Sequence, residues 1–229
     1  MLPPVTRIRS SMTKPRIIMV SSPKGGVGKS TLCRNLLVCA AHSGKRVLGV
    51  DFDAQGTLAT WARRRETLRA AIPDCLPVPV QQAELADWRA ALEKARSSGA
   101  DVVFFDTPPS VEVNISAILS LSAEADFLLV PCQPSQDDLD SATPWMTRLS
   151  SAGVRAAFVL NKANRRTRSF GVIRTRLLSL GHVCPVEIPA LEEIAEASGK
   201  GLGVMDLSRS QSAEVFEGMW SYVAREVQL

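Results

Sequence analysis

Short, wholly apolar runs alternate along the chain with longer stretches whose apolar residues recur at helical spacing. The apolar runs are typical of parallel strands buried on both faces, and the stretches between them are typical of helices. The pattern predicts an α/β fold of one domain, with a mostly parallel sheet and helices on both faces. Seven strands are expected: Arg16–Ser21, Arg46–Asp51, Leu76–Val80, Asp101–Asp106, Asp126–Pro131, Val154–Leu160 and Val183–Ile188.

Eight helices are expected between and after these strands: Lys29–Ala41, Leu58–Ala70, Glu84–Ser97, Val113–Ser122, Asp138–Ser150, Phe170–Leu180, Leu191–Ala197 and Ala213–Val227. Because ligands of parallel α/β sheets bind beyond the carboxyl ends of the strands, functional residues are expected in the polar clusters there. Residues 1–15 are basic without an apolar core, so we interpret them as a disordered leader, with a DNA- or partner-binding arm as the alternative. Residues 16–229 then form the folded domain.

The composition is typical of an ordinary globular protein. The 229 residues suffice for a substantial core, and no apolar run reaches the roughly 20 residues that span a bilayer. The net charge of +4 is small, so any affinity for nucleic acid must come from local clusters of basic residues. Five scattered cysteines, none in C-x-x-C spacing, indicate reduced, mostly buried thiols in a cytoplasmic protein rather than a metal site.

A glycine-rich stretch follows the first predicted strand and opens the first predicted helix. Residues 21–31 read S-S-P-K-G-G-V-G-K-S-T. Glycines let successive backbone N–H groups point inward at a polyanion, and the helix N-terminus adds its positive end. Lys29 supplies a full charge, and the Ser30 hydroxyl can ligate a metal ion bound to phosphates. The stretch predicts a nucleoside-triphosphate site, although Pro23 stands where the usual P-loop has glycine and an extra lysine, Lys24, precedes the paired glycines.

Acidic residues follow the second and fourth predicted strands. The run D-F-D-A-Q-G begins at Asp51 and includes Asp53, whose carboxylate can orient an attacking water or hold a metal-bound one. The alternative for both residues is an Asx-turn that ends the strand, and it is the stronger for Asp51. The run V-V-F-F-D-T-P-P-S places Asp106 at the end of an apolar strand, which is the Walker B arrangement. With the glycine-rich stretch upstream, Asp106 is predicted to steady the magnesium shell.

Together these motifs resemble the ParA/MinD family of deviant Walker A ATPases. The resemblance rests on K-G-G-V-G-K-S-T, on D-F-D-A-Q-G and on the run that ends at Ser110, and it extends from about Pro15 to the C-terminus. Within the family the chain is most similar to small plasmid-partition ParA proteins that lack an N-terminal helix-turn-helix domain. The stretches Gly56–Ala62 and Pro131–Asp140 also resemble that subgroup. Ala54 departs from the family, which usually carries proline there.

The resemblance implies an ATPase with a single-domain P-loop NTPase fold and with ATP and Mg²⁺ as cofactors. Two copies are implied to enclose two ATP molecules as a homodimer, with Lys24 reaching the partner's nucleotide and Lys29 binding the β- and γ-phosphates. Asp53 matches the family's water-orienting aspartate, and Asn161 matches a position that contacts adenine, with a strand-end turn as its alternative. The implied catalytic residues are Lys24, Lys29 and Asp53, and the implied metal site is Ser30, Asp53 and Asp106. The implied nucleotide contacts are Lys24, Gly25, Gly26, Val27, Gly28, Lys29, Ser30, Thr31 and Asn161.

Residues 161–180 carry six basic side chains and no acidic ones. Clustered positive charge is typical of sequence-independent DNA binding through the phosphate backbone. The family's ATP-bound dimer binds non-specific double-stranded DNA through its C-terminal half, which suggests a surface that comprises Arg165, Arg166, Arg168, Arg174 and Arg176. The alternative is a solvated face or residues near the nucleotide. A second basic run, Arg63–Arg65, is interpreted as a solvated helix face.

The resemblance therefore predicts a cytoplasmic, nucleoid-associated ATPase that segregates plasmid or chromosomal DNA. It would be weak alone and stimulated by a small centromere-binding ParB-type protein. The main alternative is a ParA-like ATPase that positions a protein cargo, and nothing in the sequence separates the two. A binding module that hydrolyses little ATP is disfavoured by Asp53. A membrane-binding MinD-like protein is disfavoured because the tail 213–229 has three glutamates and one arginine, a charge that does not suit anionic lipid. A tyrosine kinase is disfavoured because the chain has a single tyrosine, and an iron–sulfur carrier is disfavoured because Cys132 lacks an evident partner.

Overall fold

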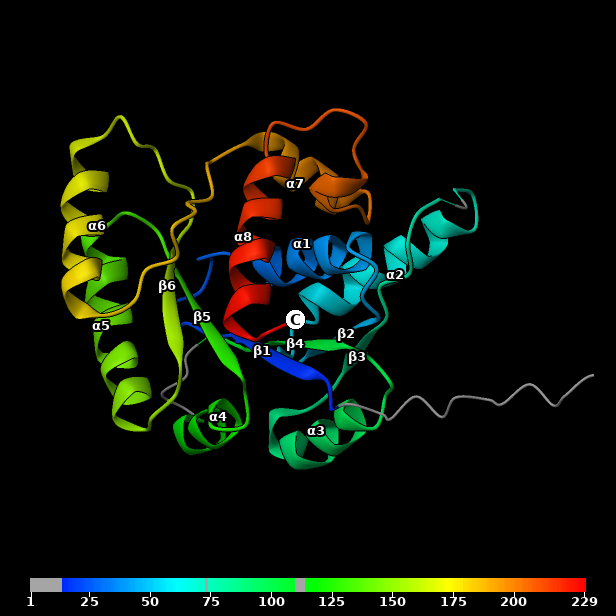
Figure 1. The fold of residues 1–229 in the computed structure, drawn as a ribbon, viewed down its shortest axis with the longest axis horizontal. Helices are drawn as coiled ribbons and strands as arrows, with labels where there is room; N and C mark the ends of the chain where they lie inside the picture. The colour runs from blue at the N-terminus through cyan, green and yellow to red at the C-terminus, as the bar shows by residue number, and fades with distance from the viewer. Residues whose placement is uncertain (1–13, 73, 110–113) are drawn as a thin grey trace, which may run out of the picture.

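Over residues 14–72, 74–109 and 114–229, which the computed structural model describes, six parallel strands form one central sheet (Figure 1). The strands are β1 (Arg16–Val20), β2 (Val47–Asp51), β3 (Val80–Gln82), β4 (Val102–Asp106), β5 (Phe127–Cys132) and β6 (Ala156–Leu160). Their order across the sheet is β3-β2-β4-β1-β5-β6, and every pair is parallel. The predicted single-domain α/β fold with a parallel sheet is confirmed.

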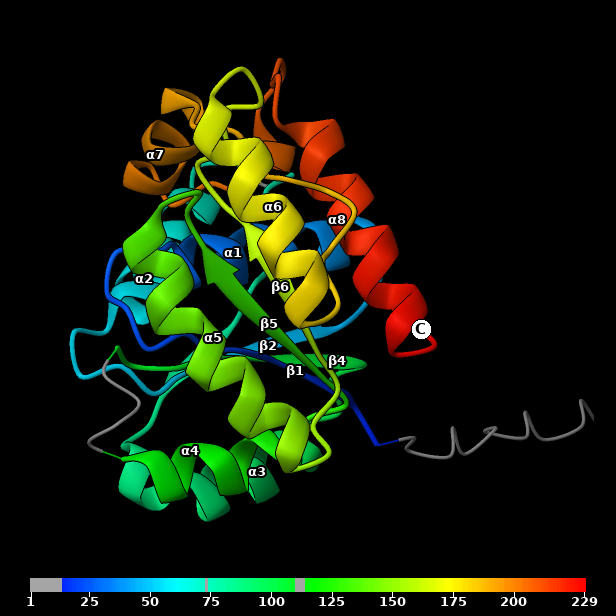
Figure 2. The same ribbon diagram turned by 90° about the vertical axis from the view of Figure 1, so that its left-hand side faces the viewer.

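Helices cover both faces of this sheet, as the sequence pattern predicts (Figures 1 and 2). They are α1 (Lys29–His42), α2 (Thr57–Arg69), α3 (Trp88–Arg96), α4 (Ile115–Ser122), α5 (Gln136–Ser151), α6 (Arg168–Leu180), α7 (Glu192–Gly199) and α8 (Ala213–Glu226), with 3-10 turns η1 (Leu85–Asp87) and η2 (Val204–Asp206). Alternate residues of β1 enter different cores. Ile17 and Met19 pack with α3, α4, α5 and α6, whereas Ile18 and Val20 pack with α1, α2 and α8. Strands β1, β2, β4, β5 and β6 are therefore largely apolar because both of their faces are covered, whereas the edge strand β3 is partly polar.

Helix α1 is buried between the sheet and α8. Nine successive residues of α1, Leu32 to Ala40, are buried. The apolar face of α8 covers α1 with Phe216, Met219, Trp220 and Val223, which belong to the same core cluster. The residues of α8 that a membrane anchor would need are thus packed against the body of the protein.

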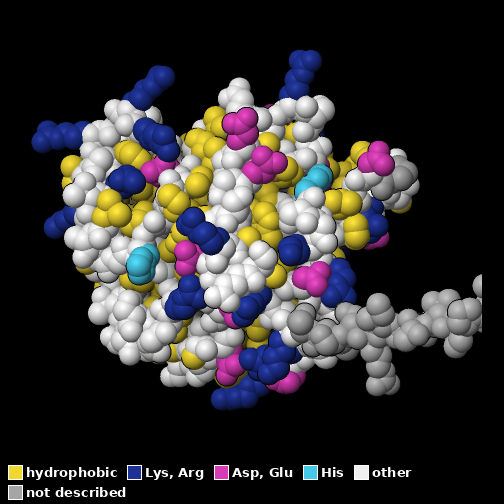
Figure 3. All heavy atoms as spheres, in the orientation of Figure 1, with side chains coloured by type: hydrophobic (Ala, Val, Ile, Leu, Met, Phe, Trp, Pro, Cys, Tyr) yellow, Lys and Arg dark blue, Asp and Glu magenta, His cyan; other side chains and the backbone are white. Residues whose placement is uncertain are grey.

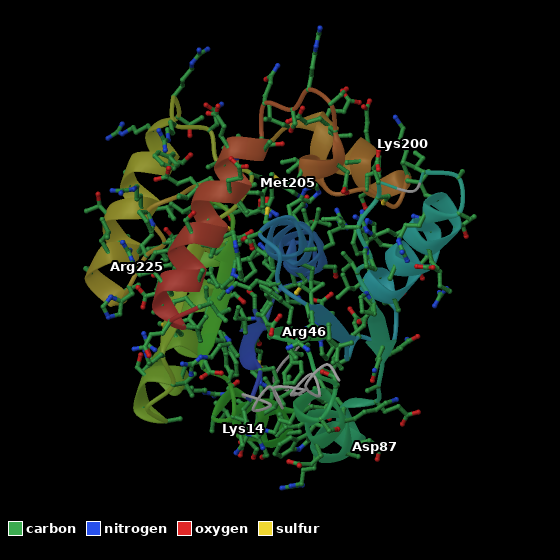
Figure 4. All side chains as sticks on the ribbon, turned by 45° about the vertical axis from the view of Figure 1, so that its right-hand side comes forward. Lys14, Arg46, Asp87, Lys200, Met205 and Arg225 are labelled. Atoms are coloured by element: carbon green, nitrogen blue, oxygen red, sulfur yellow. The ribbon has the colours of Figure 1, made fainter. Side chains whose placement is uncertain are left out.

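Because all strands run in one direction, the segments that follow them gather at one edge of the sheet. Figure 2 shows β5 directed toward the end of the molecule that carries the start of α5 and α7. Lys14 and Arg46 precede β1 and β2 and mark the opposite edge (Figure 4). The P-loop and both aspartate runs lie at the carboxyl ends of the strands, where the sequence predicts the functional residues.

Two of the predicted strands are wrong in part, and proline is the physical reason. The segment Val183–Ile188 runs beside β6 but contributes only an isolated bridge, Val183 to Phe158. Pro185 lies within it and has no N–H to continue the ladder. The predicted strand Leu76–Val80 contains Pro77 and Pro79, and the observed β3 begins only at Val80.

The interpretation of Arg63–Arg65 as a solvated face is wrong for one of its three residues. Arg63 and Arg64 are exposed, whereas Arg65 is 1% exposed and forms two hydrogen bonds with the carboxylate of Asp206, at 2.7 and 3.0 Å. Arg65 also donates to the carbonyls of Leu76 and Gly201. This network fastens α2 to η2, because a buried arginine needs an anion and acceptors for its remaining donors.

The remaining predictions agree with the described residues or lie outside them. Helix boundaries differ by at most two residues, except that α3 begins four residues after the predicted Glu84, with the 3-10 turn η1 before it. The predicted start of the fourth helix at Val113 lies outside the described residues, as do Ser110 and residues 1–13 of the proposed leader. All five cysteines are free and buried, as expected. In the part of the chain that the structure describes, no helix has the length and apolarity needed to cross a membrane.

Candidate nucleotide site

The segment between β1 and α1 forms a phosphate-binding loop. Gly28 precedes α1 in the left-handed conformation, with φ of 99°, which residues with a side chain rarely adopt. A Cβ atom at Gly28 would also lie 2.1 Å from Nδ2 of Asn161, so two independent constraints require glycine. The loop leads directly into the N-terminus of α1, where backbone N–H groups without intrahelical acceptors can bind phosphate oxygens.

A cavity of about 510 Å³ opens beside this loop. Its walls come from the loop and α1, from the start of α2, from Asn161 and Lys162, and from the segment 189–195 around the start of α7. Lys29 lines the cavity and is 7% exposed, and its Nζ donates to the backbone carbonyls of Lys24 (3.1 Å) and Ser22 (3.4 Å). Burial lowers the pKa of Lys29, against the opposing influence of Asp106 and Asp53. The cavity therefore has a volume that suits a nucleotide and a lysine beside its phosphate-binding loop.

Asp106 ends β4 as a fully buried carboxylate, and neither of its oxygens accepts a hydrogen bond from the described residues. Burial raises its pKa to about 7, while the neighbouring Ser30 hydroxyl and Lys29 ammonium act to lower it. A buried carboxylate without a partner is costly unless a ligand brings positive charge. Mg²⁺ suits this position because proteins hold it with one or two carboxylates plus phosphate oxygens. Among the described residues, no group of three or more His, Cys, Asp or Glu is placed to hold a metal ion.

Asp106→Asn is expected to stabilise the nucleotide-free protein above pH 7. The pKa of Asp106 is raised from 3.8 to about 7, so the folded protein keeps a proton that the unfolded chain releases, and the free energy of unfolding falls as the pH rises from about 4 to 7. At about 1.4 kcal/mol per pKa unit, the full effect is on the order of 4 kcal/mol. Thermal denaturation should show the variant well above wild type at pH 8 and much closer to it at pH 5. An equal difference in Tm at both pH values would contradict a buried charge.

Asp51, which ends β2, and Asp53, which follows it, have different environments. Asp51 is buried, and its carboxylate accepts the backbone N–H groups of Asp53 (3.0 Å) and Ala59 (2.9 Å). Asp51 therefore forms an Asx-turn and fastens the start of α2, and Asp53 forms a second Asx-turn through the N–H of Gln55. Asp53 lines the cavity, and its Oδ1 accepts the N–H of Gln55 at 3.0 Å. Of the two carboxylates, Asp53 is the one that a ligand in the cavity can meet.

Lys24 is not among the residues that line the cavity. Its Nζ lies 2.5 Å from Oδ1 of Asp138 in the first turn of α5, and this hydrogen bond raises the pKa of Lys24. The other oxygen of Asp138 accepts the N–H of Gln133 at 2.6 Å. The Lys24 side chain is 39% exposed, whereas the Asp138 side chain is 3% exposed. The extra lysine is therefore held at the surface by a carboxylate of the stretch Pro131–Asp140, a pairing that the sequence did not predict.

Asn161 supports the phosphate-binding loop. Its Nδ2 donates to the carbonyl of Val27 at 2.6 Å, and its Oδ1 accepts the N–H of Lys162 at 2.9 Å. It also lines the cavity at the end of β6. The structure thus places Asn161 in the predicted site, with its polar atoms already bonded within the chain, and a contact with adenine stays a prediction.

Not all basic side chains of the segment 161–180 are available to bind DNA, because some of them form ion pairs within the chain. Arg165 and Arg174 both pair with Glu187, a buried carboxylate from the segment that follows α6. Arg166, Arg168 and Arg176 are exposed and form no ion pair within the described residues. The absence of acidic residues from 161–180 was misleading, because Glu187 lies outside this segment in the sequence and contacts its arginines only in the folded chain.

Sequence reasoning missed three parts of the site: Thr57, the segment 189–195, and Arg34, a charged side chain within the mostly apolar buried stretch of α1. Only Arg34 had a visible signal, since a lone charge within the run L-C-R-N-L-L-V-C is unusual for a buried helix. The other two have no signal in residue type or spacing.

A phosphate-binding loop between a central parallel strand and a buried helix, with a Walker B carboxylate on the neighbouring strand, defines a P-loop nucleotide-binding protein. The family model described as the CobQ/CobB/MinD/ParA nucleotide binding domain matches residues 18–204, and the chain belongs to this family. The predicted likeness to the ParA/MinD ATPases is therefore confirmed.

Individual relatives carry different names. The chain is 32% identical over 169 residues to the maintenance of carboxysome distribution protein A of Halothiobacillus neapolitanus, covering 72% of this chain and 74% of the relative. It is also 32% identical over 186 residues to the chromosome-partitioning ATPase Soj of Thermus thermophilus, covering 71% and 70%. Among solved structures, the MinD cell division protein of Aquifex aeolicus matches with a TM-score of 0.75 at 18% identity, over 92% of this chain and 97% of that one, which shows the shared fold.

Proposed function

We propose that this protein is a magnesium-dependent ATPase that dimerises when it binds ATP. The observation that carries the proposal is the position of Lys24. Although it belongs to the phosphate-binding loop, it does not line the cavity of its own chain, and its side chain is partly exposed. A lysine so placed is available to the nucleotide of a second copy, where it would add positive charge to the transferring phosphoryl group.

In this proposal the chain's own groups bind and orient the reactants. Lys29 and the loop N–H groups bind the β- and γ-phosphates, and Ser30 and Asp106 hold Mg²⁺, which neutralises phosphate charge when bound. Asp53 accepts a hydrogen bond from water and orients its oxygen toward the γ-phosphorus. The oxygen–phosphorus bond to water forms as the bond to the bridging oxygen breaks. ADP leaves with that electron pair, and the water oxygen ends in inorganic phosphate, with one of its protons passing to a phosphate oxygen.

Sedimentation velocity and phosphate release test the proposal together. The protein is expected to sediment as a monomer without nucleotide and with ADP, and as a dimer with Mg-ATP. Slow release of phosphate is expected from the protein alone. One unchanged species under all three conditions, or no binding of ATP, would overturn the proposal.

We propose the segregation of DNA as the task, with a ParB-type protein as the stimulating partner. The Soj relatives and the basic side chains support it, and Figure 3 shows Lys and Arg side chains gathered over α6. Non-specific binding to double-stranded DNA would place the protein on the nucleoid.

Positioning of a protein cargo is the second candidate, and the relatives named for carboxysome distribution favour it. The product of the adjacent gene separates the two candidates. A small protein that binds repeated DNA sites and stimulates ATP turnover supports segregation. A protein that binds a protein assembly and no specific DNA supports positioning.

Double charge reversal at Arg166 and Arg168 is expected to weaken binding to a random DNA duplex at least tenfold. Each lost phosphate contact removes counterion release, so the slope of log K against log salt should fall by about two. Fluorescence anisotropy at several salt concentrations in the presence of ATP measures both quantities. Arg89→Glu, an exposed arginine on α3, serves as the matched control. Equal binding by the double variant and the control would move the DNA surface elsewhere.

A further inference from the structure

Arg34 is a charged side chain built into the wall of the nucleotide cavity. It lies on α1, it is 7% exposed, and it lines the cavity together with Ser30 and Thr31. The surrounding residues of α1, Leu32, Cys33 and Leu36, are buried and apolar. Desolvation of so buried a guanidinium is expensive, so its presence calls for a compensating partner.

The described residues supply little compensation. Nη2 of Arg34 donates to Oγ1 of Thr31 at 3.0 Å, and no other side-chain hydrogen bond from Arg34 is formed within the described residues. Its Nε has no acceptor there. Glu192 and Asp53 also line the cavity, but neither forms an ion pair with Arg34 in the described part of the chain. Burial lowers the pKa of Arg34 to about 10, against the opposing influence of Asp106, which shows how poorly the cation is solvated.

The place of Arg34 along α1 indicates which anion it meets. Arg34 lies four residues beyond Ser30, about one helical turn further from the phosphate-binding end. Side chains on a helix lean toward its N-terminus, which agrees with the contact to Thr31. Lys29 and the loop N–H groups are assigned to the β- and γ-phosphates, and Ser30 is assigned to the Mg²⁺ bound to them. The α-phosphate is the anionic group that remains between these and the base.

We propose that Arg34 donates hydrogen bonds to the α-phosphate of the bound nucleotide. This inference rests on the proposed function, because it requires that the cavity bind ATP and ADP. The contact serves both nucleotides equally, since both carry an α-phosphate. Arg34 is thus a substrate-binding residue outside the P-loop motif, and it acts within one chain, in contrast to the role proposed for Lys24.

Arg34→Met tests the inference, because methionine fills similar space without the charge. The affinity for Mg-ADP, measured by calorimetry on the nucleotide-free protein, is expected to fall about tenfold, the loss typical of a charge-assisted hydrogen bond. The affinity for a non-hydrolysable ATP analogue should fall by the same factor. The Tm of the nucleotide-free variant should equal or exceed that of wild type, since a poorly compensated charge has been removed. Arg46→Met is the control, because Arg46 lies at the opposite edge of the sheet and pairs with Asp101.

The outcomes separate this inference from the proposed function. If wild type binds neither nucleotide, the proposed function fails. If wild type binds and Arg34→Met binds equally well, the α-phosphate contact is overturned while the proposed function stands. A lower Tm with unchanged ADP affinity would assign Arg34 a structural role and also overturns the contact. Should Arg34→Met not fold, Arg34→Lys replaces it, with a loss of at least threefold in ADP affinity expected from the different donor geometry and unchanged affinity again overturning the contact.

Discussion

Asp53→Ala is expected to bind ATP and to dimerise while its turnover falls by at least two orders of magnitude. The Asp53 carboxylate lines the cavity, and its Oδ1 already accepts the N–H of Gln55. We therefore expect the other oxygen to orient the attacking water, a contribution of about 10²- to 10⁴-fold. Phosphate release at saturating Mg-ATP measures turnover, and sedimentation velocity measures the dimer in the same samples.

Two further variants separate the role of the Asp53 charge in turnover from its role in the loop structure. Asp53→Asn retains an oxygen that can accept the Gln55 N–H, so it should keep the loop and still lose turnover. Asp87→Ala removes an exposed aspartate at the start of α3, labelled in Figure 4, and should turn over like wild type. Turnover by Asp53→Ala equal to that of Asp87→Ala would sink the water-orienting role.

Lys24→Gln is expected to remain monomeric with Mg-ATP at concentrations at least 100-fold above those at which wild type dimerises. The Lys24 ammonium is 2.5 Å from Oδ1 of Asp138 within its own chain. To reach a partner's phosphates, the Lys24 ammonium must separate from the Asp138 carboxylate. That carboxylate then still accepts the N–H of Gln133, and it lies in the first turn of α5, where the helix dipole stabilises negative charge. The remaining interactions reduce the cost of separating the pair. Glutamine cannot supply the charge that the partner's nucleotide would gain.

Lys45→Gln is the matched control for this experiment. Lys45 lies between α1 and β2, at the sheet edge opposite the phosphate-binding loop, so its loss should leave ATP-dependent dimerisation unchanged. Calorimetry with ADP on both variants checks that the cavity itself is intact. Normal dimerisation by Lys24→Gln would show that Lys24 does not act across an interface, and its pairing with Asp138 would then be structural.

The fold could be predicted from the sequence because both faces of the sheet are covered. Burial on both faces makes β1, β2, β4, β5 and β6 nearly continuous apolar runs, and the sequence predicts each of them within two residues of its observed bounds. The errors fell where proline interrupts an otherwise apolar segment, at Pro77, Pro79 and Pro185. Such segments look like strands by residue type, yet they lack the N–H groups that a ladder needs.

The candidate site was predictable where chain order places residues together. The P-loop, Asp53 and Asp106 each follow a parallel strand, so the topology alone brings them to one edge. Contacts between distant segments carry no such signal. Asp138 meets Lys24 across 114 residues, and Glu187 meets Arg165 across 22. Asp138 and Glu187 form ion pairs with some of the basic side chains and leave others unpaired, and only the folded chain shows which ones are paired.

The packing of α8 over α1 has a consequence for the order in which the protein is made. The phosphate-binding loop, Asp53, Asp106 and all six strands leave the ribosome before Phe216, Met219, Trp220 and Val223. Until then one face of α1 is not covered by α8. Arg65 likewise pairs with Asp206 only after a further 141 residues have been synthesised. Nascent chains with such uncovered apolar helices are the species that aggregate or recruit chaperones. The nucleotide-binding core is therefore complete only after α8 has been synthesised.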